Sequence, residues 1–228
     1  MEFISRIIKT AVGIFSLFGI FGFTKVLIQV FIQIIKNSSD FLIFLLGILV
    51  FTIVWFLYLI RRGNLWSTLE HELTHALFAT LFLKRIHSIS ASRKRGGVIA
   101  IEGGNSIIAL SPYFFPLAAV LVLILKFLVP VSLKIYFIFL LGVAYQFHLI
   151  NLIREFHVGQ SDIRASGYLF STLFITFGNL VFLGLILVGI SDGWQQLFFF
   201  LKNGFMATLN YVQLLYDFIY QQMIQTRT

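Results

Sequence analysis

The sequence predicts an all-α polytopic membrane protein with about five transmembrane helices, one small β-hairpin and interfacial helices at both ends. Three observations lead to this fold class. Of the 228 residues, 59% are hydrophobic and only 11% are charged, and long uncharged runs recur along the chain. A soluble domain averages about 25% charged residues, and a membrane-spanning helix needs about 20 apolar residues. The composition therefore favours a bilayer over water as the surroundings of most side chains.

The charge distribution favours a lipid partner over a nucleic acid. The net charge is +8, but the basic residues lie mostly between apolar runs, where they orient spans and contact anionic headgroups. They form no patch interleaved with aromatic residues, so nucleic acid is not an expected partner. The chain has no cysteine, which excludes disulfides and thiolate metal sites. The first apolar run lacks a small-x-small cleavage site, so we expect no removable signal peptide.

Residues 1–40 form an N-terminal segment that could span the membrane or lie at its surface. If residues 11–35 crossed the bilayer, Lys25 would fall near mid-membrane, where a charge is costly. Placing the segment on the cytoplasmic face gives that face the larger excess of Lys and Arg, as the positive-inside rule requires. We therefore expect an interfacial N-terminal helix.

The core of the protein is expected at residues 41–190. Residues 41–60 are 20 uncharged residues followed by two arginines and form the clearest span. Residues 65–83 are expected to form the next span. The sequence from Ser67 to Glu70 fits a capping box, which would start this helix at Ser67.

Residues 86–104 differ in composition from the apolar runs around them. Two short runs rich in β-branched residues, 86–90 and 98–101, flank a basic tip that contains two glycines. This pattern predicts a β-hairpin, with an irregular loop as the alternative.

The rest of the core is expected to contain three further spans. Residues 107–129 form one that Pro112 and Pro116 would kink or divide, with Lys126 extending to the surface near its end. Residues 131–153 span back, a polar break follows at 157–164, and residues 166–190 form the last clear span. The C-terminal segment 191–228 is amphipathic and is expected to lie at the interface rather than to cross.

One helix carries a chemical motif, His71-Glu72-Leu73-Thr74-His75. Two histidines four residues apart lie on the same helix face and can bind one Zn²⁺. The glutamate between them can accept the proton of a water molecule that the metal activates. Ionisable groups at membrane depth are costly and usually functional. The alternative is a polar patch that hydrogen-bonds neighbouring helices. Glu70 is interpreted as the capping-box residue.

A catalytic zinc site needs a third protein ligand and an open position. The spacing His-Glu-x-x-His-x-x-Gly-x-x-His is excluded, because Phe78 and Leu81 occupy the required positions. Asp162 is favoured, because it follows a polar break and the two intervening spans return the chain to the side of the motif. Its alternative role is to cap a helix that begins near Ile163. The other candidates are Glu102, His148, Glu155 and His157.

Together these features resemble the site-2 protease family of intramembrane zinc metallopeptidases. The resemblance covers roughly residues 65–190 and rests on the sequence HELTHAL in an apolar helix, a Gly-containing hairpin, a proline-containing span and a distant aspartate. It implies that His71, His75 and Asp162 bind one Zn²⁺ and that Glu72 is the general base. Many members have glycine directly after this aspartate, whereas Ile163 follows here, so the chain would represent a compact, divergent branch.

The resemblance implies a zinc-dependent intramembrane endopeptidase that cuts single-span membrane proteins in or near their transmembrane segments. Residues 98–102 could capture an unwound substrate as an added strand. Asn105 could bind the substrate backbone, or could be an ordinary turn residue. The expected location is a membrane, specifically a bacterial cytoplasmic membrane.

Two alternative functions stay open at this point. One is a membrane metallopeptidase of the prenyl-protein-processing or stress-protease type, whose third ligand would be a glutamate, Glu102 or Glu155. The other is a metal-binding transporter or scaffold that keeps the histidines without hydrolysis.

Overall fold

The computed structural model describes residues 2–37, 39–60, 65–92, 96–191 and 193–225. The chain forms two compact units, which are described separately. The first contains Met1–Asn37 and Thr172–Thr228, and the second contains Ser38–Ser171.

The first unit is helical. It contains α1 (Glu2–Asn37), α9 (Trp194–Gln225) and most of α8 (Tyr168–Ser191). Helix α1 packs against α9. The ring of Phe23 meets those of Phe177 and Phe200 edge to face, with centroids 5.5 and 5.6 Å apart. This aromatic cluster holds the three helices together by burial and by favourable edge-to-face geometry.

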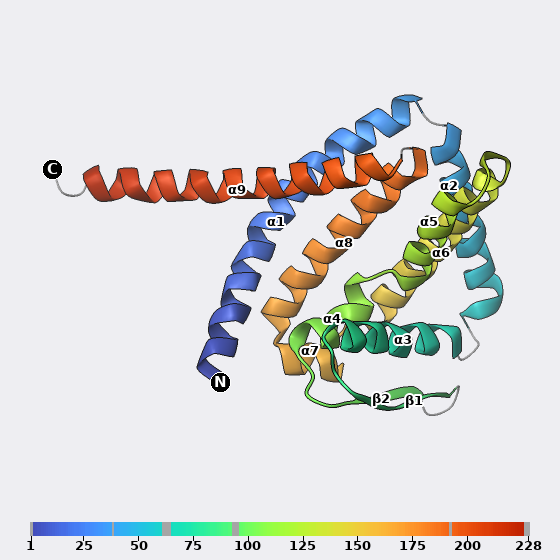
Figure 1. Ribbon diagram of the computed structural model, residues 1–228, viewed down its shortest axis with the longest axis horizontal. Helices are drawn as coiled ribbons and strands as arrows, with labels where there is room; N and C mark the ends of the chain where they lie inside the picture. Colours follow the sequence, from blue (N-terminus) through green and yellow to red (C-terminus); the bar gives the residue numbers. More distant parts are fainter. Residues whose placement is uncertain (1, 38, 61–64, 93–95, 192, 226–228) are drawn as a thin grey trace. The chain divides into compact units, whose positions relative to one another are not determined.

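The second unit contains the motif, the hairpin and the remaining helices (Figure 1). Figure 1 shows α3 running across the direction of α2, α5 and α6, with the hairpin beside it. In chain order the elements are α2 (Ser39–Val54), the π-helix η1 (Trp55–Leu59), α3 (Leu65–Leu81), β1 (Ile86–Ser92), β2 (Gly96–Ile101), α4 (Ser106–Phe114), α5 (Leu117–Leu128), the 3₁₀ helix η2 (Val131–Leu133), α6 (Lys134–Glu155) and α7 (Ser161–Ser166).

Two glycines allow α2 and α6 to pack closely. A Cβ atom on Gly47 would overlap the carbonyl of Phe139, and one on Gly142 would overlap the carbonyl of Phe44. Such close approach of backbones at small residues is typical of helices that associate in membranes. Helix α5 packs against the same helix, α6. Helix α6 is therefore the element around which this unit is built.

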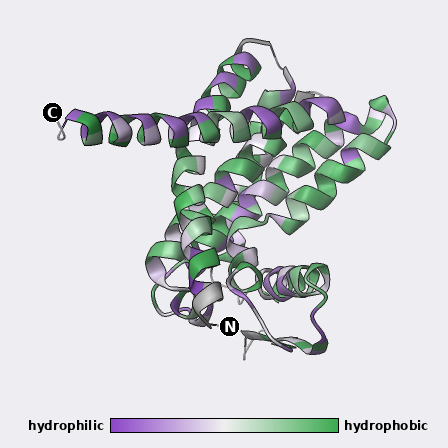
Figure 2. Cartoon of the chain, turned by 60° about the vertical axis from the view of Figure 1, so that its left-hand side comes forward, coloured by the Kyte–Doolittle hydropathy of each residue, from purple (hydrophilic) through white to green (hydrophobic). Residues whose placement is uncertain are grey.

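Four helices in the described part of the chain are long and apolar enough to cross a membrane: Arg6–Ile35, Ser39–Leu59, Val131–Glu155 and Tyr168–Ile190. Helices α4 and α5 form a fifth candidate if the pair is one span, although they are bent by 68° at the break between them. Large apolar side chains such as Leu42, Phe56 and Leu57 are more than 60% exposed, as expected for residues that face lipid. In Figure 2 most of the helical ribbon has the colour of hydrophobic residues, whereas hydrophilic and hydrophobic residues alternate along the C-terminal helix. The chain is thus an integral membrane protein.

By length and composition, two helices differ from the expectations about the spans. The motif helix α3 is not among the candidate spans. Its 17 residues reach only about 26 Å at ~1.5 Å per residue, less than the ~30 Å hydrocarbon core. Conversely, the N-terminal segment forms one continuous helix whose residues 6–35 qualify as a span. Lys25 is exposed on that helix, where its long stem can carry the charge toward the surface. Helix α9 is not among the spans, in line with its amphipathic sequence.

The hairpin and the proline break are confirmed. Strands β1 and β2 pair antiparallel, with Ile89 opposite Ile99, so the loop alternative is wrong; residues 93–95 of the tip lie outside the described residues. The helix is divided at Phe115 and Pro116, where α4 ends and α5 begins. Lys126 does not extend to the surface. Only 4% of this residue is exposed, and its Nζ lies 5.3 Å from the centroid of the Phe127 ring.

The expected capping box does not form. Helix α3 begins at Leu65, and the Glu70 carboxylate serves another helix instead. Its Oε1 accepts the backbone N–H of Ala118 at 3.1 Å, in the first turn of α5, where helix N–H groups lack partners and a negative charge is favourable. Its Oε2 accepts from Asn151 Nδ2 of α6 at 3.4 Å. Glu70 therefore ties α3 to both α5 and α6.

We expect Gly142→Val to destabilise the protein by about 1–3 kcal/mol, because the added side chain must displace the backbone of α2. Thermal unfolding of the purified protein in detergent would measure the loss. Gly104→Ala is the matched control, since no heavy atom lies within 4 Å of its Cβ position. Equal unfolding midpoints for the Gly142 variant and the control would contradict the role assigned to the close α2–α6 approach.

Candidate metal centre

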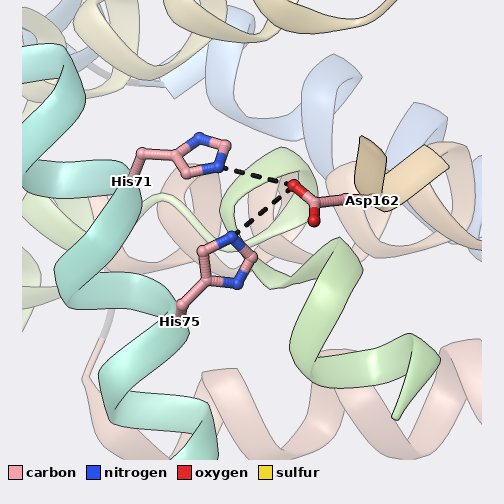
Figure 3. A group of neighbouring side chains, drawn as sticks. All are labelled: His71, His75 and Asp162. Carbon is pink, nitrogen blue, oxygen red and sulfur yellow. Dashed lines mark ion pairs between the residues drawn. The ribbon is translucent and has the colours of Figure 1, made fainter. Parts of the chain in front are cut away.

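Three side chains from two helices converge in the second unit. Helix α3 presents His71 and His75, one turn apart, and the short helix α7 presents Asp162 (Figure 3). One carboxylate oxygen of Asp162, Oδ2, lies 3.7 Å from the Nε2 atom of each histidine. One possible ligand atom from each residue lies within 4.8 Å of the others. The structure thus brings together the three residues expected as metal ligands.

Each histidine is oriented by a hydrogen bond at its other ring nitrogen. His71 Nδ1 lies 2.7 Å from Glu155 Oε2, and His75 Nδ1 lies 2.8 Å from the backbone carbonyl of Ile108. A carbonyl only accepts hydrogen bonds, so His75 Nδ1 must be the donor. A carboxylate favours the same tautomer for His71. Both Nε2 atoms are therefore turned toward Asp162, the orientation that metal ligation requires.

The donor set fits Zn²⁺. Nitrogen and oxygen ligands at about 2.0–2.1 Å in a tetrahedron lie roughly 3.3 Å apart, close to the observed 3.7 Å between Nε2 and Oδ2. Three protein ligands leave one position open for water or substrate, which is the pattern of catalytic rather than structural zinc sites. The group could therefore hold a metal ion.

Glu72 lies beside these ligands and is 6% exposed. It lines a cavity of about 450 Å³ together with His71, His75, Asp162 and strand β2. Gly97 of this strand lies directly against Glu72, because a Cβ atom at position 97 would overlap the Glu72 carboxyl group. Only glycine leaves space for the carboxylate at this place. The expected general base therefore opens into the same cavity as the ligands.

The charges of the site follow from burial and contact. Burial alone lowers the pKa of His71, but its bonds to Asp162 and Glu155 outweigh burial and raise the pKa to about 9. Burial raises the pKa of Asp162, yet the two histidines outweigh it and hold that pKa well below its usual range. Burial raises the pKa of Glu72 above its usual value, against the lowering effect of His71 and His75. A metal that binds here displaces a proton from His71.

Tyr113 is a site residue that the sequence analysis missed. Its hydroxyl donates to Asp162 Oδ2 at 3.3 Å, and its ring meets the His71 ring edge to face with centroids 5.4 Å apart. The side chain is 1% exposed. No signal in the sequence separates this tyrosine from its apolar neighbours in α4. It holds both a histidine and the aspartate in place.

The other candidate ligands lie outside this group of three, although Glu155 lines the same cavity. Glu102 is 62% exposed and lies 3.9 Å from His87 Nε2. Glu155 contacts the far side of the His71 ring, not the face where the ligands converge. His148 is buried in α6, and His157 Nδ1 accepts from the N–H of Gly159. None of these four belongs to the group formed by His71, His75 and Asp162.

Two alternative cap assignments are resolved. Asp162 lies inside the first turn of α7, whose N-cap residue is Gln160, so the cap role for Asp162 is wrong. Asn105 is the N-cap of α4, where its Oδ1 accepts the N–H of Ile108 at 2.9 Å. This local bond matches the turn interpretation of Asn105.

Comparison of the chain with protein-family models, with curated proteins and with solved structures finds no significant match.

We expect the zinc content of purified variants to separate ligands from their neighbours. Asp162→Asn should lose most bound zinc, because it removes a charged ligand. Glu155→Gln should weaken zinc binding about 10- to 100-fold, because it orients His71 without touching the metal. Elemental analysis and zinc titration would measure both effects.

Glu102→Gln is the control for these variants, since that carboxylate lies outside the group. Full zinc occupancy in Asp162→Asn, or loss of zinc in Glu102→Gln, would show that the third ligand is assigned wrongly.

Proposed function

We propose that the chain is a zinc-dependent endopeptidase that cleaves membrane-protein substrates in or near their transmembrane segments. One observation carries this proposal: a single cavity is lined by the three possible metal ligands, by Glu72 and by strand β2. A site that only stored metal would need neither an adjacent base nor a strand beside it.

The residues of this chain divide the chemistry between them. When bound, Zn²⁺ supplies Lewis-acid chemistry, which lowers the pKa of a water molecule toward about 7 and polarises a peptide carbonyl. Glu72 accepts the proton of the attacking water and delivers it to the leaving amine. His71, His75 and Asp162 hold the ion, while Tyr113 and Glu155 hold these ligands.

Strand β2 is suited to present the substrate. Gly97, Val98 and Ile99 line the cavity beside Glu72, and β2 pairs with β1 along one edge in the described hairpin. An extended peptide can add to the other edge through main-chain hydrogen bonds. A transmembrane helix hides its peptide bonds, so an unwound segment held in this way is the form that a protease can attack.

The resemblance to the site-2 protease family supports the substrate class. The cavity lies in the unit that also contains the candidate spans α2 and α6, so single-span membrane proteins are the proposed substrates. The alternative with a glutamate ligand is less favoured, because Glu102 and Glu155 lie outside the ligand group, although Glu155 lines the same cavity. The non-catalytic alternative is separated from the proposal by the role of Glu72.

We expect Glu72→Gln to retain zinc and to lose at least about 100-fold in cleavage rate, because the amide cannot accept the proton. The assay would use the purified protein with single-span segments placed between two tags, and would follow the fragments. Glu102→Gln serves as the control, with activity unchanged. Cleavage by Glu72→Gln at the rate of the unsubstituted protein would overturn the mechanism.

We expect Gly97→Ala to reduce cleavage about 100-fold at full zinc occupancy, because the added methyl group moves the Glu72 carboxylate by about 1 Å. The same cleavage assay and zinc analysis would measure both quantities. Gly104→Ala adds the same methyl group in open space and should leave cleavage unchanged. Unchanged cleavage by Gly97→Ala would contradict the role of Gly97 in placing Glu72.

A further inference from the structure

Helix α4 contains a proline in its interior. Pro112 stands seventh in the nine-residue helix Ser106–Phe114, and the helix continues past it for two residues. Proline has no backbone N–H, so it cannot donate to the carbonyl four residues before it. That carbonyl belongs to Ile108. In a regular helix it would be occupied by the residue at 112.

The Ile108 carbonyl is the group that orients His75. It accepts from His75 Nδ1 at 2.8 Å and from Ser111 Oγ at 2.8 Å. All three residues are buried, with exposures of 2% for Ile108, 6% for His75 and 0% for Ser111. A buried carbonyl without a partner is costly. Because Pro112 lacks the helical donor, the side-chain donors His75 Nδ1 and Ser111 Oγ satisfy this carbonyl instead.

Pro112 is not required for the bend of the chain. The break between α4 and α5 falls after Phe114, and Pro116 occupies the N-cap position of α5. The 68° angle arises at this later point. Pro112 therefore lies before the bend. It occupies the position whose N–H would otherwise donate to the Ile108 carbonyl.

The surroundings explain why a backbone group holds His75. Helix α3 packs on α4 here, with Phe78 meeting Phe114 and Phe115 edge to face at 5.5 and 5.2 Å. A carboxylate like the one that holds His71 would have to be desolvated in this apolar contact, at a large cost. A carbonyl released from its helix is a neutral acceptor that is already in place.

We propose that Pro112 is a positioning residue of the metal centre: by lacking an N–H it reserves the Ile108 carbonyl for His75 and so fixes the tautomer that ligates. This inference rests on the proposed metal site, but not on hydrolysis. A regular residue at 112 would supply an N–H that competes with His75 for the same carbonyl. The His75 ring would then lose its fixed orientation and tautomer.

The test compares metal binding with stability in the full-length protein in detergent. We expect Pro112→Ala to weaken Zn²⁺ binding about 10- to 100-fold, as for other groups that orient a ligating histidine. The thermal midpoint of the metal-free variant should be unchanged or higher, because alanine restores a helical hydrogen bond. If the proline were only structural, its replacement would lower both the Zn²⁺ affinity and the thermal midpoint.

A matched variant separates the missing N–H from the proline ring. A lactic-acid ester unit at position 112 has the side chain of alanine but no N–H, and should bind Zn²⁺ within about twofold of the unsubstituted protein. Ser111→Ala removes the second donor to the same carbonyl and should also keep the affinity. In ¹⁵N spectra of the metal-free protein, His75 should carry its proton on Nδ1, and should show mixed tautomers in Pro112→Ala.

The outcomes are distinct. Unchanged Zn²⁺ affinity in Pro112→Ala, a lower midpoint of that metal-free variant, or an ester variant as weak as the alanine variant would overturn the inference. Failure of the unsubstituted protein to bind Zn²⁺ would overturn the metal site itself. Zinc binding without cleavage would overturn only the proposed protease activity.

Discussion

Two hydrogen bonds on the far sides of the imidazole rings set the geometry of the site, one from His71 Nδ1 to Glu155 and one from His75 Nδ1 to Ile108. They turn both Nε2 atoms toward Asp162, and they do so from two different elements. Glu155 is the last residue of α6, and Ile108 belongs to α4. The rest of the second unit can be understood as the means of holding α3, α4, α6 and α7 in the positions that these bonds require.

The motif helix α3 is held among apolar helices and is not among the candidate spans. Its polar side chains find partners on neighbouring elements. Ser67 donates to Glu155 at 2.9 Å, and Glu70 accepts from the first turn of α5. Each bond satisfies a group that would be costly to leave unpaired in a low-dielectric setting. These bonds tie α3 to α5 and α6.

The sequence predicts the features that depend on local pattern. The spacing of His71 and His75, the β-branched runs of the hairpin and the proline break are all short-range signals, and the structure contains each of them. Asp162 could be selected because the order of the spans brings it back to α3. The sequence decides least about α3 and α1, because charges inside an apolar run do not reveal whether a helix crosses the membrane. Only a few residues of length separate α3 from the candidate spans.

The rest of the site has no sequence signal. Tyr113 resembles any aromatic residue of an apolar helix, and the Glu70 carboxylate fits a local capping pattern that the long-range bond to Ala118 overrides. The Ile108 carbonyl is the extreme case, since every residue has one. Only the fold shows that this particular carbonyl faces an imidazole. Gly97 likewise reads as a turn residue until strand β2 is placed against Glu72.

The use of a backbone atom to hold His75 affects how this position can vary. A ligand held by a side chain, as His71 is by Glu155, loses its partner through one substitution at the partner's own codon. The atom that holds His75 is present whatever residue stands at 108, so an alanine scan would change the packing there and leave the bond in place. The sensitive position is Pro112, four residues after Ile108. It contributes by lacking the backbone hydrogen that would compete for the Ile108 carbonyl. A scan of side-chain substitutions would therefore find little effect on the site at Ile108, which contacts His75, and a clear effect at Pro112, which acts only by lacking an N–H.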